Sequence, residues 1–181
     1  KKLYEDTASH GSGIRVSPHV AADGTLAKIH SYGIIHRDIS PDNLILGPDG
    51  KLTLIDFGAA KAYSPTIDQT CSIILKGGYA PCEQYDSRGK LGPWSDIYAL
   101  CAVIYFCITK HAPDDAFQRM LHDELKSPSE LGISISPALE RILMKGLSMD
   151  IPSRYQHMQD LICDVKEQIA KWTQRSFDFD G

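Results

Sequence analysis

Hydrophobic residues follow two different patterns along this chain, and the change falls near residue 94. Before it, the apolar runs at 43–46 and 51–57 are short and flank the turn sequence Gly-Pro-Asp-Gly, which is typical of a β-hairpin. After it the pattern is helical, and residues 95–109 are apolar on all sides, as in a buried central helix. The sequence therefore predicts a mostly α fold with a small antiparallel β-ribbon.

Three amphipathic helices are expected after the central one. Apolar residues recur at helical spacing over residues 114–125, 137–147 and 156–172. The apolar positions of the first of these helices are Phe117, Met120 and Leu121.

Two more helices are expected near the N-terminus. One covers residues 1–9 and ends at the His-Gly-Ser-Gly sequence. The other starts at Ser17-Pro18, where serine can cap the helix and proline can occupy its first turn, and runs toward His30. Asp23-Gly24 weakens the middle of this second helix.

Charge and cysteine content narrow the class of protein. The net charge is −4 and no basic run exceeds two residues, so no nucleic-acid partner is expected. The five cysteines form no Cys-x-x-Cys pair, which favours reduced thiols and a cytoplasmic location. The longest apolar stretch, 97–109, is shorter than the about 20 residues needed to cross a bilayer. We expect one domain over 1–172 and a polar tail over 173–181.

Three polar residues lie at the ends of the predicted ribbon. Asp38 and Asn43 lie around its first strand, and Asp56 follows its second. A carboxylate that accepts a proton, with an Asn oxygen and a second carboxylate that hold Mg²⁺, suits phosphoryl transfer, because catalysis there is mainly positioning and charge neutralisation. Each element also has a plainer interpretation, since Asp-Phe-Gly is commonly a turn and His-Arg-Asp commonly a solvated loop.

Longer motifs favour the chemical interpretation. HRDISPDN at 36–43 and DFG at 56–58 resemble the catalytic and metal-binding loops of eukaryotic-like protein kinases, most closely those of bacterial serine/threonine kinases. GGYAPCEQY at 77–85 resembles the end of their activation segment, WSDIYAL at 94–100 the start of their central helix, and DIPSRYQ at 150–156 the region of a structural arginine. The resemblance implies a kinase C-terminal lobe that uses ATP and Mg²⁺ to phosphorylate a protein serine or threonine.

The resemblance also implies roles for individual residues. Asp38 is the base that orients the substrate hydroxyl, Asn43 and Asp56 are the Mg²⁺ ligands, and Ile45 lies beneath the adenine. Arg37 pairs with a phosphorylated activation segment. The candidate phosphosites there are Thr66, Thr70 and Ser72, with a solvated loop as the alternative for these hydroxyls.

Other residues have structural roles by the same resemblance. His36 stacks on Phe57, next to Gly58 of the DFG motif, and Asp96 accepts hydrogen bonds from the backbone of the catalytic loop. Glu83 and Arg154 form a buried ion pair by the same resemblance.

The sequence departs from the family pattern at four positions. Ser40 replaces the lysine that stabilises the transferred phosphoryl group, and Lys76 replaces a threonine nearby, so we hypothesise that Lys76 supplies the missing charge. The alternative is a solvated loop lysine and a slower enzyme. Phe106 stands where kinases directed to basic substrates carry an acid, and Lys110 stands where glycine is expected after the central helix.

Residues 1–181 contain no glycine-rich loop, strand lysine or partner glutamate of the family pattern. We therefore expect the C-terminal lobe alone, inactive by itself and prone to self-association through exposed apolar surface. A non-catalytic or pseudokinase scaffold that binds a partner protein is the main alternative. Arg37, the 77–85 segment and the Asp96 helix argue against a third class, the aminoglycoside-type phosphotransferases.

Overall fold

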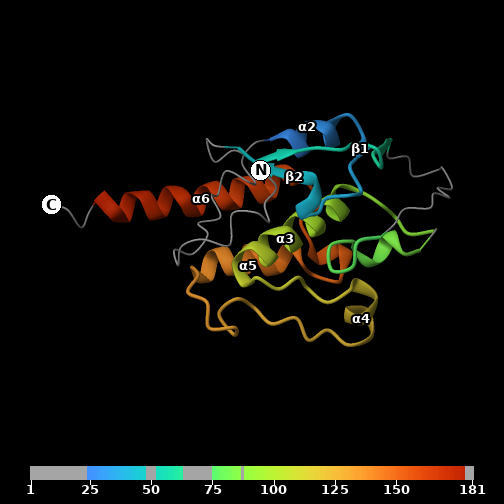
Figure 1. Cartoon of the computed structure of the whole chain (residues 1–181). Coiled ribbons are helices and arrows are strands. Elements are labelled where there is room, and N and C mark those ends of the chain that lie inside the picture. The colour runs from blue at the N-terminus through green and yellow to red at the C-terminus, as the bar shows by residue number, and fades with distance from the viewer. Residues whose placement is uncertain (1–23, 48–51, 63–74, 87, 178–181) are drawn as a thin grey trace.

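The computed structural model describes residues 24–47, 52–62, 75–86 and 88–177. The fold is mostly helical, as the sequence predicts, and it has two small antiparallel sheets where one ribbon was expected. Figure 1 shows helix α3 near the centre of the molecule, with α2 and the short strands at one edge and α4 at the opposite edge.

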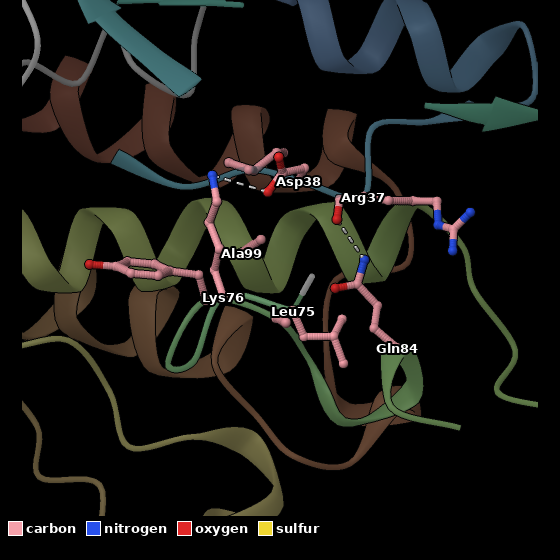
Figure 2. A pocket seen from close by; sticks show the side chains of 9 residues that line it. Arg37, Asp38, Leu75, Lys76, Gln84 and Ala99 are labelled. Carbon is pink, nitrogen blue, oxygen red and sulfur yellow. Dashed lines mark hydrogen bonds and ion pairs between the residues drawn. The ribbon is translucent and has the colours of Figure 1, made fainter. Parts of the chain in front are cut away.

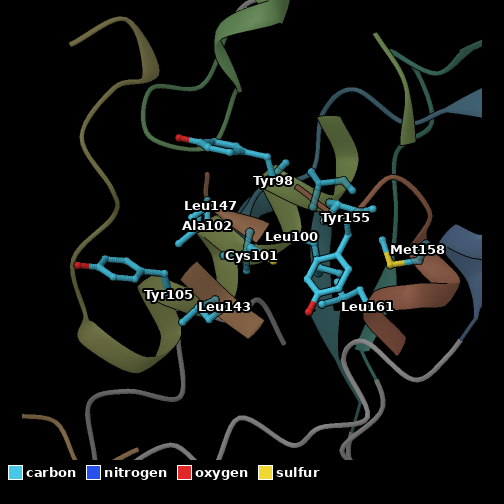
Figure 3. Packing of buried hydrophobic residues seen from close by; sticks show 14 of the residues in the cluster. Tyr98, Leu100, Cys101, Ala102, Tyr105, Leu143, Leu147, Tyr155, Met158 and Leu161 are labelled. Carbon is cyan, nitrogen blue, oxygen red and sulfur yellow. The ribbon is translucent and has the colours of Figure 1, made fainter. Parts of the chain in front are cut away.

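Helix α3 (Pro93–Thr109) forms the centre of the hydrophobic core, and Pro93 occupies its first turn, where a backbone N–H has no helical partner. Helix α3 packs against α5 (Pro137–Gly146) and α6 (Met158–Phe177). The close approach of α5 depends on Gly146, because a Cβ atom there would lie 2.2 Å from the Cys101 sulfur. Figure 3 shows the cluster between these helices, which includes Tyr98, Cys101, Leu143, Leu147, Met158 and Leu161.

Helix α3 ends as the sequence predicts, at Thr109, with an unusual cap. Lys110 adopts φ 65° and ψ 9°, the left-handed conformation that glycine usually supplies. The left-handed cap is therefore retained without glycine. Helix α6 continues to Phe177, beyond the predicted helix end at residue 172, and residues 178–181 lie outside the described residues.

Helix α4 is shorter than predicted, and the side that it turns toward the protein interior is not its apolar side. It covers Ala116–Leu121, capped by the Asp115 carboxylate, which accepts a hydrogen bond from the Phe117 N–H. Its buried residues are Ala116 and Arg119. The predicted apolar face is instead exposed, at Phe117, Met120 and Leu121. The prediction was wrong because the Arg119 side chain finds polar partners in the interior.

Helix α2 (Thr25–Ser31) begins later than predicted. Gly24 adopts φ 66°, which ends any continuous helix from Ser17 to His30. The predicted helix at 1–9 and the first part of the predicted 17–30 helix lie outside the described residues.

Two strand pairs complete the fold. The predicted hairpin is confirmed as β2 (Leu44–Leu46) and β3 (Leu52–Leu54), antiparallel with Leu44 opposite Leu54. The second pair, β1 (Ile34–Ile35) with β4 (Lys61–Ala62), was not predicted, because two-residue strands carry too little periodic signal.

Within the described ranges, no helix has the length and apolar character that a membrane crossing requires. The four described cysteines, Cys82, Cys101, Cys107 and Cys163, are free thiols.

Candidate active site

A buried carboxylate fixes the loop that contains Asp38. Asp96, 1% exposed, accepts hydrogen bonds from the backbone N–H of His36 at 2.8 Å and of Arg37 at 2.9 Å. His30 Nε2 lies 2.8 Å from the same carboxylate. Arg37 has φ 69°, a conformation unfavourable for a side chain, so these bonds hold the loop in a shape it would not otherwise prefer.

Asn43 holds the Asp38 side chain. Its Nδ2 donates to Asp38 Oδ2 at 2.7 Å and to the Asp38 carbonyl at 2.8 Å. Asn43 closes a 3₁₀ turn over Pro41–Asn43, in which its N–H donates to the Ser40 carbonyl at 3.0 Å. The Asp38 carboxylate, 24% exposed, is thus fixed and still accessible.

Lys76 lies on another segment of the chain, and its side chain extends toward Asp38 (Figure 2). Its Nζ donates to Ser40 Oγ at 2.8 Å and lies 3.3 Å from Asp38 Oδ1 and 3.8 Å from Asp42 Oδ2. Ser40 is buried, whereas the Lys76 side chain is 31% exposed. The structure therefore brings Asp38, Ser40 and Lys76 together, and a small cavity is lined by Asp38 and Lys76 among others.

Asp56 reaches this region through the hairpin. The Ile55 N–H donates to the Asn43 carbonyl at 2.9 Å, which extends the β2–β3 pairing up to Asp56. Asp56 has φ 61°, and its exposed carboxylate accepts the Gly58 N–H at 2.9 Å. The carboxylate is therefore held against the backbone of residue 58 by this bond, and it stays exposed to solvent.

Asn43 and Asp56 each offer a side-chain oxygen of the kind that Mg²⁺ binds. Because the Asn43 Nδ2 faces Asp38, its Oδ1 is directed elsewhere, and Asp56 adds an exposed carboxylate. The described residues hold no group of three His, Cys, Asp or Glu side chains able to bind a metal by themselves. One carboxylate and one amide oxygen fit Mg²⁺, which keeps waters and takes further oxygens from a bound phosphate.

His36 packs edge-on against Phe57, with ring centroids 4.7 Å apart. Burial lowers the pKa of His36, although the carboxylates of Asp96, Asp38 and Asp56 act in the opposite direction. His36 is fully buried and Phe57 is 45% exposed.

Ile45 is half-buried on β2, opposite Thr53. Its neighbour Leu44 belongs to the hydrophobic cluster, together with Val103 and Cys107 of α3. The predicted adenine contact of Ile45 stays a prediction.

Glu83 and Arg154 form a buried ion pair, with Arg154 Nη1 2.8 Å from Glu83 Oε1. Ser95 donates to the same oxygen at 2.8 Å, and Arg154 lies over the Tyr98 ring, 4.9 Å from its centroid. Gln84, next to Glu83, donates to the Arg37 carbonyl at 3.0 Å. This network ties residues 82–84, which form a 3₁₀ turn, to the loop that contains Asp38.

Arg119 is a residue that the sequence analysis missed. It is 4% exposed, donates to Asp123 at 2.8 and 2.9 Å, and reaches the Tyr98 hydroxyl at 2.9 Å and the Leu147 carbonyl at 3.0 Å. The spacing of Arg119 and Asp123 on successive helical turns is the only sequence signal, and it equally describes an exposed pair.

The predicted phosphosites Thr66, Thr70 and Ser72 lie outside the described residues.

The fold and this arrangement of residues define a protein of the kinase class. Residues 22–165 match the protein kinase domain family, and the chain belongs to that family. This match favours a protein kinase over the aminoglycoside-type alternative.

Several relatives are bacterial kinases. The chain is 33% identical over 188 residues to the serine/threonine-protein kinase PrkC of Bacillus subtilis, which covers 91% of this chain and 29% of that protein. It is 31% identical over 147 residues to the serine/threonine-protein kinase PknB of Mycolicibacterium smegmatis, covering 75% and 23%. The tyrosine-protein kinase MasK of Myxococcus xanthus is 33% identical over 144 residues, covering 76% and 22%. The chain thus spans about a quarter of the length of these relatives.

Proposed function

We propose that this chain carries the catalytic loop of an ATP-dependent protein serine/threonine kinase. The observation that supports this most is the Asp38 carboxylate, held by Asn43 at 2.7 Å, accessible to solvent and 3.3 Å from the Lys76 ammonium. A proton acceptor beside a fixed cation is the arrangement that phosphoryl transfer to a hydroxyl needs.

Each residue has a distinct role in the proposed reaction. Asp38 accepts a hydrogen bond from the substrate hydroxyl, orients its oxygen toward the terminal phosphorus of ATP and takes its proton. The new O–P bond forms as the bond between that phosphorus and the bridging oxygen breaks, which leaves ADP. Asn43 keeps the Asp38 carboxylate in position.

Asn43 and Asp56 are the proposed Mg²⁺ ligands through their side-chain oxygens. When bound, Mg²⁺ neutralises charge on the phosphate oxygens. Asp56 keeps its orientation through the hydrogen bond from the Gly58 N–H.

Lys76 is proposed to supply the cation that Ser40 does not provide. The Lys76 Nζ already lies within hydrogen-bond distance of Ser40 Oγ, so its charge occupies the space next to position 40. Preorganised charge beside the reacting oxygens stabilises the transition state more than it would in water.

The 181 residues are proposed to be the C-terminal lobe of the catalytic domain and to turn over little by themselves, because they include neither a glycine-rich loop nor the strand lysine that grips ATP. The exposed Phe57, 45% accessible, supports self-association of this lobe. The four cysteines that the structure describes are free thiols, which supports a cytoplasmic setting.

The test uses the full-length natural protein with Mg²⁺-ATP labelled on the terminal phosphate and a mixture of protein substrates. We expect label on serine or threonine, identified by mass spectrometry, and none with the Asp38→Asn variant. Label on tyrosine alone would overturn the proposed acceptor, whereas equal label with Asp38→Asn would overturn the proposed site. Partner binding with no transfer under any condition would favour the scaffold alternative.

A further inference from the structure

The Asp115 carboxylate joins the start of helix α4 to the segment that contains the 3₁₀ turn at 82–84. It accepts a hydrogen bond from the Tyr85 hydroxyl and another from the Phe117 N–H at 2.9 Å. Partial burial, and then the bond to Asp115, raise the pKa of Tyr85, so the hydroxyl keeps its proton and remains the donor. The bond therefore connects two parts of the chain that are 30 residues apart in sequence.

The same carboxylate lies against the turn that carries Lys76. A Cβ atom on Gly77 would lie 3.4 Å from Asp115 Oδ2, and one on Gly78 would lie 2.5 Å from the Pro113 carbonyl oxygen. Gly78 also has φ 81°, in the left-handed region that favours glycine. The two glycines thus let the backbone that follows Lys76 pack directly on the loop before α4.

Hydrogen bonds within the turn fix the Lys76 backbone. The N–H groups of Tyr79 and Ala80 both donate to the Lys76 carbonyl at 3.0 Å. From this backbone the Lys76 ammonium reaches Ser40 Oγ at 2.8 Å and Asp38 Oδ1 at 3.3 Å. Because a lysine side chain is long and flexible, the position of its ammonium depends on where its backbone is held. Displacement of the turn would therefore move the charge away from Asp38.

The segment has a second anchor that does not depend on the Tyr85 hydroxyl. Two residues earlier, the buried Glu83 carboxylate pairs with Arg154 at 2.8 Å. Tyr85→Phe removes one hydroxyl and leaves this ion pair in place. The variant should therefore keep the fold and lose only the attachment to Asp115.

We infer that Tyr85 and Asp115 are positioning residues for the proposed reaction. Their hydrogen bond holds the Asp115 carboxylate against Gly77, and this contact keeps the Lys76 ammonium beside Asp38. Neither Tyr85 nor Asp115 is a catalytic residue, because both act through Lys76. This inference rests on the proposed function, in which Lys76 supplies the cation, and adds the two residues that keep this cation in place.

Steady-state kinetics of the full-length natural protein with Mg²⁺-ATP and a protein substrate test the inference. Tyr85→Phe should lower kcat about tenfold and leave KM for ATP within about twofold of wild type, because a displaced cation weakens the transition state and not the binding of ATP. Tyr105→Phe is the matched control. It also removes one hydroxyl, which donates to the Lys126 carbonyl at 2.8 Å, and it should change kcat little. Thermal unfolding of both variants confirms that they fold.

A background without Lys76 separates positioning from a general effect on the fold. In Lys76→Ala, the added change Tyr85→Phe should lower the residual kcat by less than about twofold, because the cation that it positions is gone. Reaction with an amine-acetylating reagent, followed by mass spectrometry, gives a second measurement that needs no turnover. Lys76 should react several-fold faster in Tyr85→Phe than in wild type, whereas the exposed Lys90 should react equally in both.

The outcomes separate this inference from the proposed function. A wild-type kcat in folded Tyr85→Phe, a loss of about tenfold that persists in the Lys76→Ala background, or equal Lys76 reactivity in Tyr85→Phe and wild type would overturn the inference alone. A wild-type kcat in Lys76→Ala would overturn the proposed cation and this inference with it. Absence of phosphate transfer by the wild-type protein to every substrate would overturn the proposed function.

Discussion

The Lys76 ammonium donates a hydrogen bond to the buried Ser40 hydroxyl at 2.8 Å, across 36 residues of sequence. The same ammonium lies 3.3 Å from Asp38, so one cation contacts the side chains of both Ser40 and Asp38. A lysine at this position is therefore held by the catalytic loop and is not a freely solvated side chain. Four further features of the fold lead to predictions of their own.

The substitution Asp96→Asn should weaken the fold by about 2–4 kcal/mol, because an amide can accept only one of the two backbone N–H bonds and turns a donor toward the other. Chemical denaturation of the chain measures this loss. Asp114→Asn, at an exposed position on the surface, is the matched control and should change stability little. Equal stability of the Asp96 variant and wild type would show that this carboxylate does not hold the loop.

Removing Arg154 should destabilise the chain by about 3–5 kcal/mol, since Arg154→Ala leaves the Glu83 carboxylate buried without its cation. The side chains of the pair are 0% and 3% exposed. Denaturation midpoints compared with those of Arg141→Ala, an exposed arginine on α5, separate this effect from a general loss of charge. A loss no larger than that of Arg141→Ala would contradict the prediction.

Glycine at position 110 should stabilise the protein by about 1 kcal/mol, because Lys110 holds a left-handed conformation that glycine adopts without strain. Thermal unfolding measures the gain. Lys166→Gly on the exposed face of α6 is a control with the opposite expected sign, a loss of about 1 kcal/mol. A lower melting temperature for Lys110→Gly would refute the strain argument.

Acidification should destabilise the fold through His36. Burial lowers the pKa of this imidazole below its usual 6.5, so the unfolded chain binds the proton more readily. The contribution of neutral His36 is complete above about pH 6.5 and is lost as the pH falls through the lowered pKa. Urea denaturation at a series of pH values measures this loss. Below pH 6.5, the free energy of unfolding should fall less steeply with decreasing pH for His36→Phe than for wild type. The exposed control His122→Gln should follow wild type, and a fall as steep for His36→Phe as for wild type would contradict the prediction.

The sequence predicted the elements whose signal is local. The apolar run that became α3 and the antiparallel strand pair β2–β3 both appear where the pattern indicated. Helix α4 shows the limit, because periodicity identifies which side chains share a face but not which face turns inward. Arg119 occupies the interior side through bonds to Tyr98 and Leu147, and no pattern within the helix indicates those partners.

The candidate site was predictable where it follows known motifs. Asp38, Asn43, Asp56 and Asp96 all stand in motif positions, and their contacts follow from the fold that the motifs specify. The aromatic contact between Tyr79 and Phe106, whose ring centroids lie 6.3 Å apart, was not predictable, because its two residues come from different segments.

The proposed role of Lys76 as the catalytic cation is tested by the kcat of the full-length natural protein carrying Lys76→Ala, with Lys90→Ala as an exposed lysine control. We predict a loss of about 100-fold or more for Lys76→Ala, little change for Lys90→Ala, and recovery when Ser40→Lys is combined with Lys76→Thr. Turnover of Lys76→Ala within about threefold of wild type would contradict the claim.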